Sequence, residues 1–241
     1  MGTFNIQHGV HYAHFKKTNE KLIDLANVSE AIKQMKLDLC GLNEVRNFEM
    51  IEGDCNQAKV IAEKLGYHFV FAKAIDYRGG EYGNALVSKY PILSYQCIPM
   101  KILPQDRLLN NRFYEDRVVL CAEILIDNQV LKVFITHLGL NEDELSLGVH
   151  TVCNCVKNWK QPIILMGDFN FDPNTTYYKS ICEVLYDTSG LIQGDCNTFP
   201  SDEPIHKIDY IFINNYIKVK EASIPSLTVS DHRPYVVNIT F

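Results

Sequence analysis

The stretch Pro162-Ile163-Ile164-Leu165-Met166-Gly167-Asp168-Phe169-Asn170 places an apolar run directly before an acid and an amide. A short apolar run that ends at a glycine is typical of a buried strand, and residues i and i+2 of a strand point the same way. Asp168 and Asn170 are therefore expected side by side at a strand end. A carboxylate that deprotonates water and an amide that donates to an oxyanion would suit hydrolysis. The alternative is a strand followed by an Asx turn, which this motif by itself favours.

Further apolar runs predict an α/β protein with many strands. Strands are expected over residues 2–7, 37–42, 68–72, 84–88, 118–126, 130–136, 163–166, 208–213 and 235–241, and helices over residues 19–35, 57–65, 142–159 and 177–186. Gly66 follows the second of these helices as a C-cap glycine would. Asp127-Asn128 is typical of a hairpin, which indicates a mixed sheet. Without a linker-like segment, residues 1–241 are expected to form one domain.

Composition and charge exclude some classes of function. The 241 residues are 46% hydrophobic and 22% charged, as in an ordinary globular protein. The net charge of -6 is the opposite of what phosphate neutralisation requires, so nucleic acid is disfavoured as a partner. No apolar run approaches the 18 or so residues of a membrane helix, and no protein partner is evident.

The pattern of cysteines indicates the cellular compartment. Eight are present, without a paired C-x-x-C framework, and Cys40 and Cys121 lie inside apolar runs. We expect reduced, mostly buried thiols, which favours a cytoplasmic location.

Polar side chains recur at the ends of the predicted strands. Four follow a strand, and the others precede one; in chain order they are Asn5, Glu44, His137, Asp168, Asp209, Asp231 and His232. If strands of opposite direction share an edge, these carboxylates, histidines and amides meet there. Burying so many polar groups is costly for packing alone, so the pattern predicts a metal site or a catalytic centre.

The order of these motifs resembles that of the endonuclease/exonuclease/phosphatase superfamily. The matching segments are Thr3-Phe4-Asn5-Ile6, Asn43-Glu44-Val45, Tyr82-Gly83-Asn84-Ala85-Leu86-Val87-Ser88, Glu115-Asp116-Arg117, Thr136-His137-Leu138, Gly167-Asp168-Phe169-Asn170, Ile208-Asp209-Tyr210-Ile211 and Ser230-Asp231-His232-Arg233-Pro234. The resemblance covers nearly the whole chain. It implies a four-layer α/β sandwich, in which two mixed, mainly antiparallel sheets pack face to face with helices outside.

The resemblance also implies roles for the metal side of the site. Glu44 would be the principal ligand of Mg²⁺, with Mn²⁺ as the other candidate, because a hard cation prefers oxygen donors. Asn5 would hold a metal-bound water or a phosphate oxygen beside it. Asp231 would support the same side.

Catalytic roles follow from the same resemblance. Asp168 would orient and deprotonate the attacking water, and Asn170 would donate to the phosphoryl oxygen. His232, oriented by Asp209, would face the charge that develops on phosphorus, and His137 would contact the phosphate or the leaving oxygen. Without the other motifs, His137 could equally be a satisfied core histidine, Asp231-His232 a cap before Pro234, and Asp209 an edge charge.

Substrate-binding residues are harder to assign. Asn84 and Arg117 either brace the walls of the site or touch substrate. Two variable walls are expected over residues 11–17 and 101–114, and the second contains Arg107 and Arg112, which could grip an anion in a bidentate manner.

His8, His11 and His14 recur every three residues, a spacing that would gather imidazoles around Zn²⁺ on a helical turn. The segment lacks a clear helix start. We therefore favour a loop over the site mouth, in which one of these histidines, such as His8, helps to select substrate.

These observations favour a Mg²⁺-dependent hydrolase of a small soluble phosphoester such as a sugar phosphate. The alternatives are a phosphodiesterase acting on nucleic acid or on a phospholipid such as sphingomyelin, and a catalytically silent binding module. The last is disfavoured because Glu44, Asp168 and His232 are all present.

Overall fold

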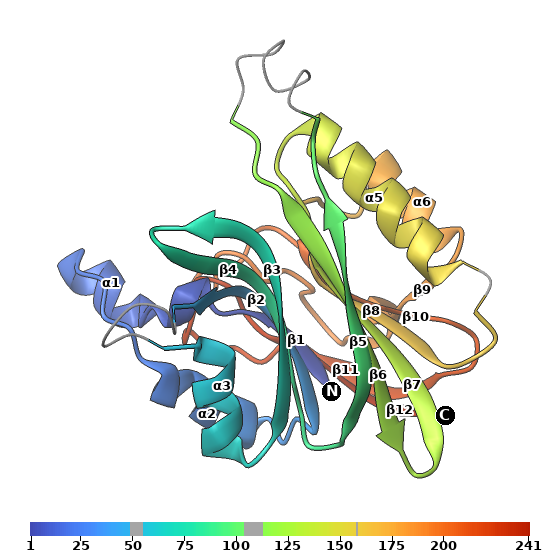
Figure 1. Ribbon diagram of the computed structural model, residues 1–241, viewed down its shortest axis with the longest axis horizontal. Helices are drawn as coiled ribbons and strands as arrows, with labels where there is room; N and C mark the ends of the chain where they lie inside the picture. Colours follow the sequence, from blue (N-terminus) through green and yellow to red (C-terminus); the bar gives the residue numbers. More distant parts are fainter. Residues whose placement is uncertain (49–54, 104–112, 158) are drawn as a thin grey trace.

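The computed structural model describes residues 1–48, 55–103, 113–157 and 159–241, and it contains two six-stranded sheets packed face to face (Figure 1). The first has the order β11-β12-β1-β2-β4-β3 and the second the order β5-β6-β7-β8-β10-β9. Strands of the first sheet are β1 (Gly2–Asn5), β2 (Leu39–Asn47), β3 (His68–Tyr77), β4 (Gly80–Ser88), β11 (Lys218–Ser223) and β12 (Tyr235–Thr240). Those of the second are β5 (Ile92–Met100), β6 (Arg117–Ile126), β7 (Gln129–His137), β8 (Ile163–Asp168), β9 (Tyr186–Asp187) and β10 (Asp209–Ile213).

Helices cover the outer face of each sheet (Figure 1). The described α-helices are α1 (Tyr12–Thr18), α2 (Leu25–Gln34), α3 (Gln57–Leu65), α5 (Glu142–Val156) and α6 (Thr176–Cys182), with 3-10 turns η1 (Gln7–Gly9) and η2 (Thr188–Leu191). Helices α2 and α3 pack on the first sheet, and α5 and α6 pack on the second. None of the described helices combines the length and the apolar character needed to cross a bilayer.

The alternation of apolar side chains along β8 explains the layers. Ile164 and Met166 lie in the core between the sheets, whereas Ile163 and Leu165 lie in the cluster that contains α5 and α6. A strand that is buried on both faces reads as a continuous apolar run, as this one does. The β1–β2 and β7–β8 pairs are parallel and the other pairs are antiparallel. The predicted four-layer sandwich with mixed, mainly antiparallel sheets is confirmed.

Some local predictions were wrong. The segment from His8 to His14 is not a loop throughout, because α1 begins after His11, whose Nδ1 accepts a hydrogen bond from the His14 amide at 3.3 Å. The strands expected over residues 68–72 and 84–88 are longer than predicted, and the turn between them is only Arg78-Gly79, both with positive φ. Helix α2 begins at Leu25, where Asp24 caps it.

Strands β5 and β11 were missed because they are edge strands with exposed side chains, so they contain no apolar run. Helix α3 was predicted with its observed bounds, and Gly66 ends it with a left-handed φ of 70°. All eight cysteines are free thiols. Only Cys40 and Cys121 are buried, so the expectation of mostly buried thiols was wrong.

Candidate active site

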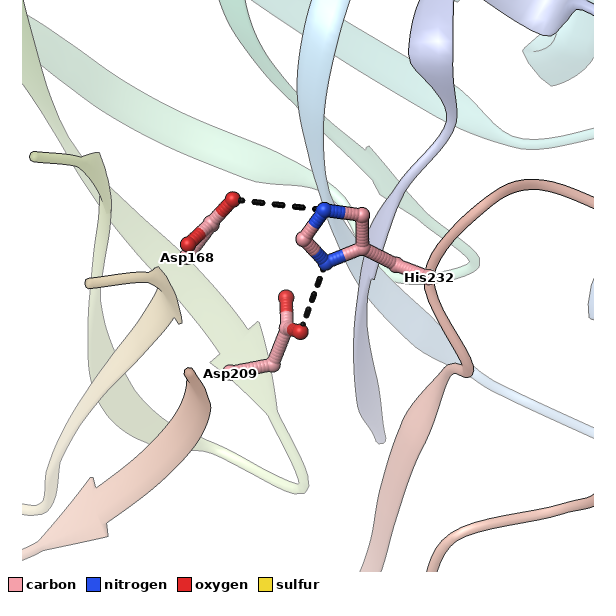
Figure 2. A group of neighbouring side chains, drawn as sticks. All are labelled: Asp168, Asp209 and His232. Carbon is pink, nitrogen blue, oxygen red and sulfur yellow. Dashed lines mark hydrogen bonds and ion pairs between the residues drawn. The ribbon is translucent and has the colours of Figure 1, made fainter. Parts of the chain in front are cut away.

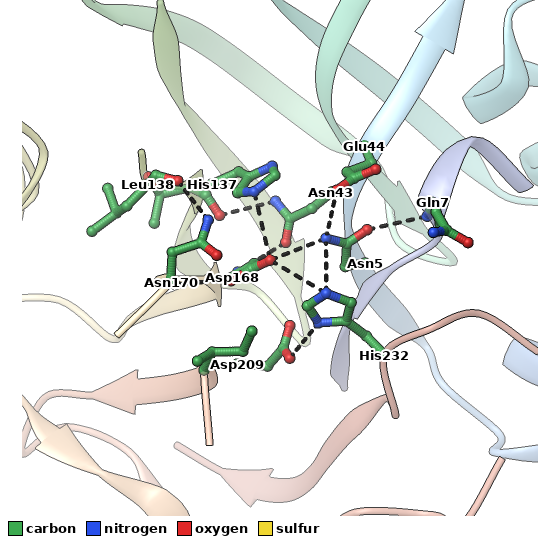
Figure 3. Close-up of polar contacts among 12 residues, drawn as sticks. Asn5, Gln7, Asn43, Glu44, His137, Leu138, Asp168, Asn170, Asp209 and His232 are labelled. Carbon is green, nitrogen blue, oxygen red and sulfur yellow. Dashed lines mark hydrogen bonds and ion pairs between the residues drawn. The ribbon is translucent and has the colours of Figure 1, made fainter. Parts of the chain in front are cut away.

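The site lies where strands of both sheets end on the same edge (Figure 3). Asn5 ends β1, and its parallel neighbour β2 passes the same level at Asn43. On the other sheet, His137 and Asp168 are paired at the ends of parallel β7 and β8, and Asp209 at the start of antiparallel β10 pairs with Asp168. The sheet edge therefore gathers polar residues from both ends of the sequence.

A bulge in β2 places two successive residues at this edge. The register with β4 shifts between Leu42 and Val45, and Glu44 has a φ of 58°. A bulge inserts an extra residue and re-aims side chains, whereas a regular strand would send neighbours to opposite faces. Asn43 thus reaches the second sheet while Glu44 reaches Asn5.

Asn43, to which the sequence motif assigned no role, connects the two sheets. Its fully buried amide donates to Asn84 Oδ1 at 2.8 Å and to the Thr136 carbonyl at 2.9 Å, and its Oδ1 accepts from the Asp168 amide at 3.0 Å. Asn84 in turn donates to the Val118 carbonyl at 2.9 Å. Since both polar atoms of Asn84 are used within the protein, it fits the bracing alternative better than substrate contact.

Replacing Asn43 with Ala is expected to lower the free energy of unfolding by roughly 3 kcal/mol or more, because three buried polar groups lose their partner. Urea unfolding monitored by circular dichroism measures this. Asn154→Ala is the matched control, because Asn154 is exposed on α5 and its loss should change stability by about 0.5 kcal/mol or less. Equal stability of the two variants would contradict the bridging role of Asn43.

Asp168 lies at the centre of the hydrogen-bond network (Figure 3). Its Oδ1 accepts from the Asn170 amide at 3.0 Å, and its Oδ2 accepts from Asn5 Nδ2 at 3.0 Å. The Nε2 atoms of His137 and His232 lie 3.5 and 3.7 Å from the same Oδ2. Burial raises the pKa of Asp168 to about 7, with Asp209 acting in the same direction and His232 against it. A carboxyl group with this pKa can accept a proton near neutral pH.

His232 and Asp209 form a close pair (Figure 2). His232 Nδ1 lies 2.8 Å from Asp209 Oδ2, and both side chains are buried. Burial alone would lower the pKa of His232, but the carboxylates of Asp209, Asp168 and Asp231 outweigh it and raise this pKa to about 10. His232 is therefore an imidazolium at neutral pH, oriented by Asp209.

The other two histidines near the centre are neutral. Burial, followed by the positive charge of Arg117, lowers the pKa of His137 well below its ordinary value. Burial and Arg46 lower the pKa of His8 to about 4. A neutral imidazole donates from one nitrogen and accepts at the other, so His137 is a hydrogen-bond donor without charge.

The side of the site opposite Asn170 is rich in carboxylates. Glu44 Oε1 accepts from Asn5 Nδ2 at 3.2 Å, and Asp231 Oδ2 accepts from Gln7 Nε2 at 2.6 Å. Burial raises the pKa of both acids, and their mutual repulsion raises that of Glu44 further. Oxygen donors that repel one another are the set that a hard divalent cation binds, so these residues fit Mg²⁺.

Asn5 lies beside Glu44, as the resemblance implies. Its Oδ1 accepts from the Gln7 amide at 3.1 Å, and its Nδ2 faces Glu44 and Asp168. In this arrangement its Nδ2 donates to the two carboxylates, and its place on the metal side stays a prediction. To hold a metal-bound water or a phosphate oxygen, Asn5 would have to use its Nδ2 as a donor, because its Oδ1 already accepts from the Gln7 amide.

Asp168, Asp209 and His232 each offer a ligand atom within 4.8 Å of the others (Figure 2). A hard cation such as Mg²⁺ prefers oxygen donors, and in this group the Asp209 oxygen nearest His232 is already engaged by His232 Nδ1 at 2.8 Å. The Glu44 side is the better candidate for a cation.

Asn170 forms the Asx turn that its motif by itself favours, and its role as a donor to a phosphoryl oxygen stays a prediction. Its backbone amide donates to Asp168, which is the Asx turn, and its side-chain Nδ2 donates to the Leu138 carbonyl at 2.9 Å. An amide nitrogen has two hydrogens, so the second remains for a substrate oxygen.

Of the two arginines predicted to bind substrate, only Arg117 lies among the described residues. Arg117 is held by Glu115 at 3.0 Å, with its side chain 11% exposed. Arg112, like Arg107, falls outside the described residues.

His11 and His14 lie on or beside α1, and their only described ring contact is with each other, at a centroid separation of 6.3 Å. His8 contacts Tyr82 and Glu44 instead, so the three histidines do not gather for Zn²⁺.

The model of the Endonuclease/Exonuclease/phosphatase family matches residues 2–232. The chain belongs to this family. Members of the family are phosphoesterases, so the chain is assigned to that class.

The relatives agree with the fold. The chain is 24% identical to the uncharacterized protein YbhP of Escherichia coli K12, over 98% of this chain and 94% of that protein. The structure resembles a family protein from Leptotrichia buccalis with a TM-score of 0.76 and 23% identity, covering 100% and 98% of the two chains. It also resembles a mannosyl-6-phosphatase of Bacteroides thetaiotaomicron with a TM-score of 0.76 and 16% identity, covering 100% and 98%.

Proposed function

We propose that this protein is a Mg²⁺-dependent hydrolase of a small, soluble phosphoric ester such as a sugar phosphate. The observation that carries the proposal is a buried carboxyl group, Asp168, held 3.7 Å from the buried imidazole of His232, which Asp209 holds at 2.8 Å. Burial raises the pKa of Asp168, and the neighbouring carboxylates raise that of His232. A base and a fixed positive charge at this separation suit proton transfer from water together with stabilisation of a phosphoryl oxygen.

Each residue has a definite task in this proposal. Asp168 accepts the proton of the attacking water, and the second amide hydrogen of Asn170 and the Nδ2 of Asn5 orient oxygen atoms beside it. His232 donates a charge-assisted hydrogen bond to the phosphoryl oxygen, while Asp209 keeps it protonated and in place. Neutral His137 donates to the phosphate or to the leaving oxygen.

Glu44 would hold the cation, with Asp231 supporting it from the facing loop. When bound, Mg²⁺ supplies Lewis acidity and a template for in-line displacement. The raised pKa values of Glu44 and Asp231 support this assignment, because a cation would relieve the repulsion that raises the pKa of Glu44.

A small substrate is supported by the net charge of -6, which disfavours binding to a polyanion. A protein of the same fold acts as a mannosyl-6-phosphatase. A diesterase for nucleic acid or phospholipid would use the same catalytic residues with different walls. The free thiols support a cytoplasmic location as part of this proposal.

Hydrolysis of a mixed panel tests the function. The panel contains sugar phosphates, nucleotides, inositol phosphates, abasic DNA and sphingomyelin vesicles, each with Mg²⁺ and with EDTA. We expect metal-dependent phosphate release from a soluble monoester. Activity on polymer or vesicles alone would support the diesterase alternative, and no activity on any member would contradict the proposal.

Glu44→Gln is expected to raise the Mg²⁺ concentration for half-maximal activity by about tenfold or more, because a cation binds a neutral amide more weakly than a carboxylate. A Mg²⁺ titration of the turnover rate measures this. Glu142→Gln, on the exposed first turn of α5, should leave the titration unchanged. An unchanged titration for Glu44→Gln would remove Glu44 from the metal site.

The dependence of kcat/KM on pH should be bell-shaped. Activity rises as Asp168 loses its proton, near pH 7 or lower when a cation is bound, and it falls toward pH 10 as His232 loses its proton. In Asp209→Asn the alkaline limb should move to lower pH, since the carboxylate that raises the pKa of His232 is gone. An alkaline limb that stays in place would show that His232 is not the titrating group.

A further inference from the structure

Near the catalytic edge, β2 carries a positively charged side chain that the proposed reaction does not use. Arg46 follows Glu44 by two residues on β2 and is half-buried. Among the described residues it makes no ion pair, and its Nε is buried without a hydrogen-bond partner. A half-buried guanidinium without a carboxylate is costly, in a chain whose acidic residues outnumber its basic ones.

The surroundings of Arg46 hold it in a defined position. Its guanidinium carbon lies 5.5 Å from the ring centroid of Phe48 and 5.6 Å from that of Tyr77. Its backbone amide donates to Gln57 Oε1 at 3.0 Å, and the buried Gln57 amide donates to the His8 carbonyl at 2.7 Å. Aromatic rings pack against the plane of a guanidinium, whereas anions bind to its N–H groups in that plane, so the two aromatic contacts are compatible with an anion at Arg46.

The same group of residues is continuous with the catalytic edge. The His8 ring lies 6.2 Å from Tyr77 and 5.1 Å from Tyr82, and His8 Nδ1 is 3.8 Å from Glu44 Oε2. A second guanidinium, that of Arg78 in the β3–β4 turn, lies 5.3 Å from the Tyr77 centroid. Both arginines contact the Tyr77 ring, and His8 links that ring to Glu44, so positive charge gathers at this end of the site.

We infer that Arg46, supported by Tyr77 and Arg78, binds a second anionic group of the substrate, so that the preferred ligand is a small bisphosphorylated molecule. This inference rests on the proposed function, since the first phosphate would lie at Asp168 and His232. The second phosphate would sit beyond Glu44, on the side of the site where the His8 ring contacts Tyr77.

Binding to glucose 1,6-bisphosphate, glucose 6-phosphate and glucose 1-phosphate tests this. Calorimetry in Mg²⁺ with the Asp168→Asn variant avoids turnover. The bisphosphate should bind more tightly than either monophosphate, and adding Arg46→Met should weaken bisphosphate binding by about 10- to 100-fold while changing monophosphate binding little. Methionine keeps the apolar stem against Phe48, and Arg46→Lys, which keeps charge without the planar fork, should give an intermediate loss.

Lys73→Met is the matched control. It removes a positive charge from β3, on which Tyr77 also lies, but Lys73 is already paired with Asp76 at 2.7 Å and Glu81 at 3.5 Å. It should not alter the preference for the bisphosphate.

Several outcomes overturn the inference. An equal loss for bisphosphate and monophosphates would place Arg46 at the reacting phosphate, and no preference for the bisphosphate would remove the second site. Tighter, Arg46-dependent binding of a short single-stranded DNA would show that the second phosphate belongs to a polymer. Failure of the substrate panel would contradict the proposed function, whereas a positive panel without an Arg46 effect would contradict this inference alone.

Discussion

Asp168→Asn is expected to lower kcat by about 10³-fold or more, because it removes the group that accepts the proton of water. The amide has the same shape, so its oxygen can still accept the hydrogen bond from the Asn170 backbone amide. Positioning of the neighbouring loop should therefore be retained. The loss is one of chemistry and not of fold.

Although Asp168→Asn loses activity, its folding stability should not decrease. The pKa of Asp168 is raised in the folded state, so ionisation costs folding stability from the unfolded pKa near 4 upward, and the cost is complete above the folded pKa of about 7. A neutral amide avoids that cost. In EDTA at pH 8, Asp168→Asn should be as stable as the wild-type protein or more so.

Turnover on the substrate found with the panel and thermal unfolding in EDTA check both expectations. Asp38→Asn is a suitable control, since Asp38 is half-exposed, is paired with Lys89 at 3.2 Å and has no contact with the site. Turnover of Asp168→Asn within tenfold of the wild-type rate would defeat the assignment of the base.

His232→Gln is expected to reduce kcat by about 10²- to 10⁴-fold, because a neutral amide replaces the charged donor that faces the phosphoryl oxygen. Unlike the previous change, this one should also destabilise the fold, by about 3–5 kcal/mol, since it leaves the Asp209 carboxylate buried without its cation. Asp209 is 1% exposed, and its Oδ1 already lacks a partner.

The double variant His232→Gln/Asp209→Asn separates the two effects. Removing the unpaired carboxylate should recover part of the lost stability but none of the activity, a non-additive result typical of residues in direct contact. Urea unfolding and kcat of the wild-type, the two single variants and the double variant complete the cycle. If the two stability losses simply add, the two residues do not form a charge pair in the folded protein.

The sequence predicted which strands carry the site residues, because an apolar run and the polar residues at its end can be recognised from a short stretch of sequence. An apolar run ending in Gly167-Asp168 predicts a buried strand with a polar end whatever surrounds it. Gly167 itself has a φ of 143°, and a side chain there would clash with the Thr136 carbonyl, which explains the residue type. The same logic correctly gave α3 and its C-cap at Gly66.

Local patterns failed where the tertiary environment supplies the signal. Strands β5 and β11 pair with neighbours at the sheet edges through backbone hydrogen bonds, so their side chains need not be apolar. Helix α1 lies in a segment without an apolar period. Asn43 is an ordinary polar residue in the sequence, and it becomes a bridge between sheets only because a bulge in β2 directs it to β7 and β8.

The sequence by itself determined the family, the sandwich fold and which residue types meet at the edge of the sheets. Only the tertiary structure decided their charge states. His137 and His232 are the same residue type, both buried near Asp168, yet one is neutral and the other is an imidazolium. The difference arises because His232 contacts Asp209 whereas His137 faces the positive charge of Arg117. Electrostatic energies depend on distances between groups remote in the chain, which the order of residues does not contain.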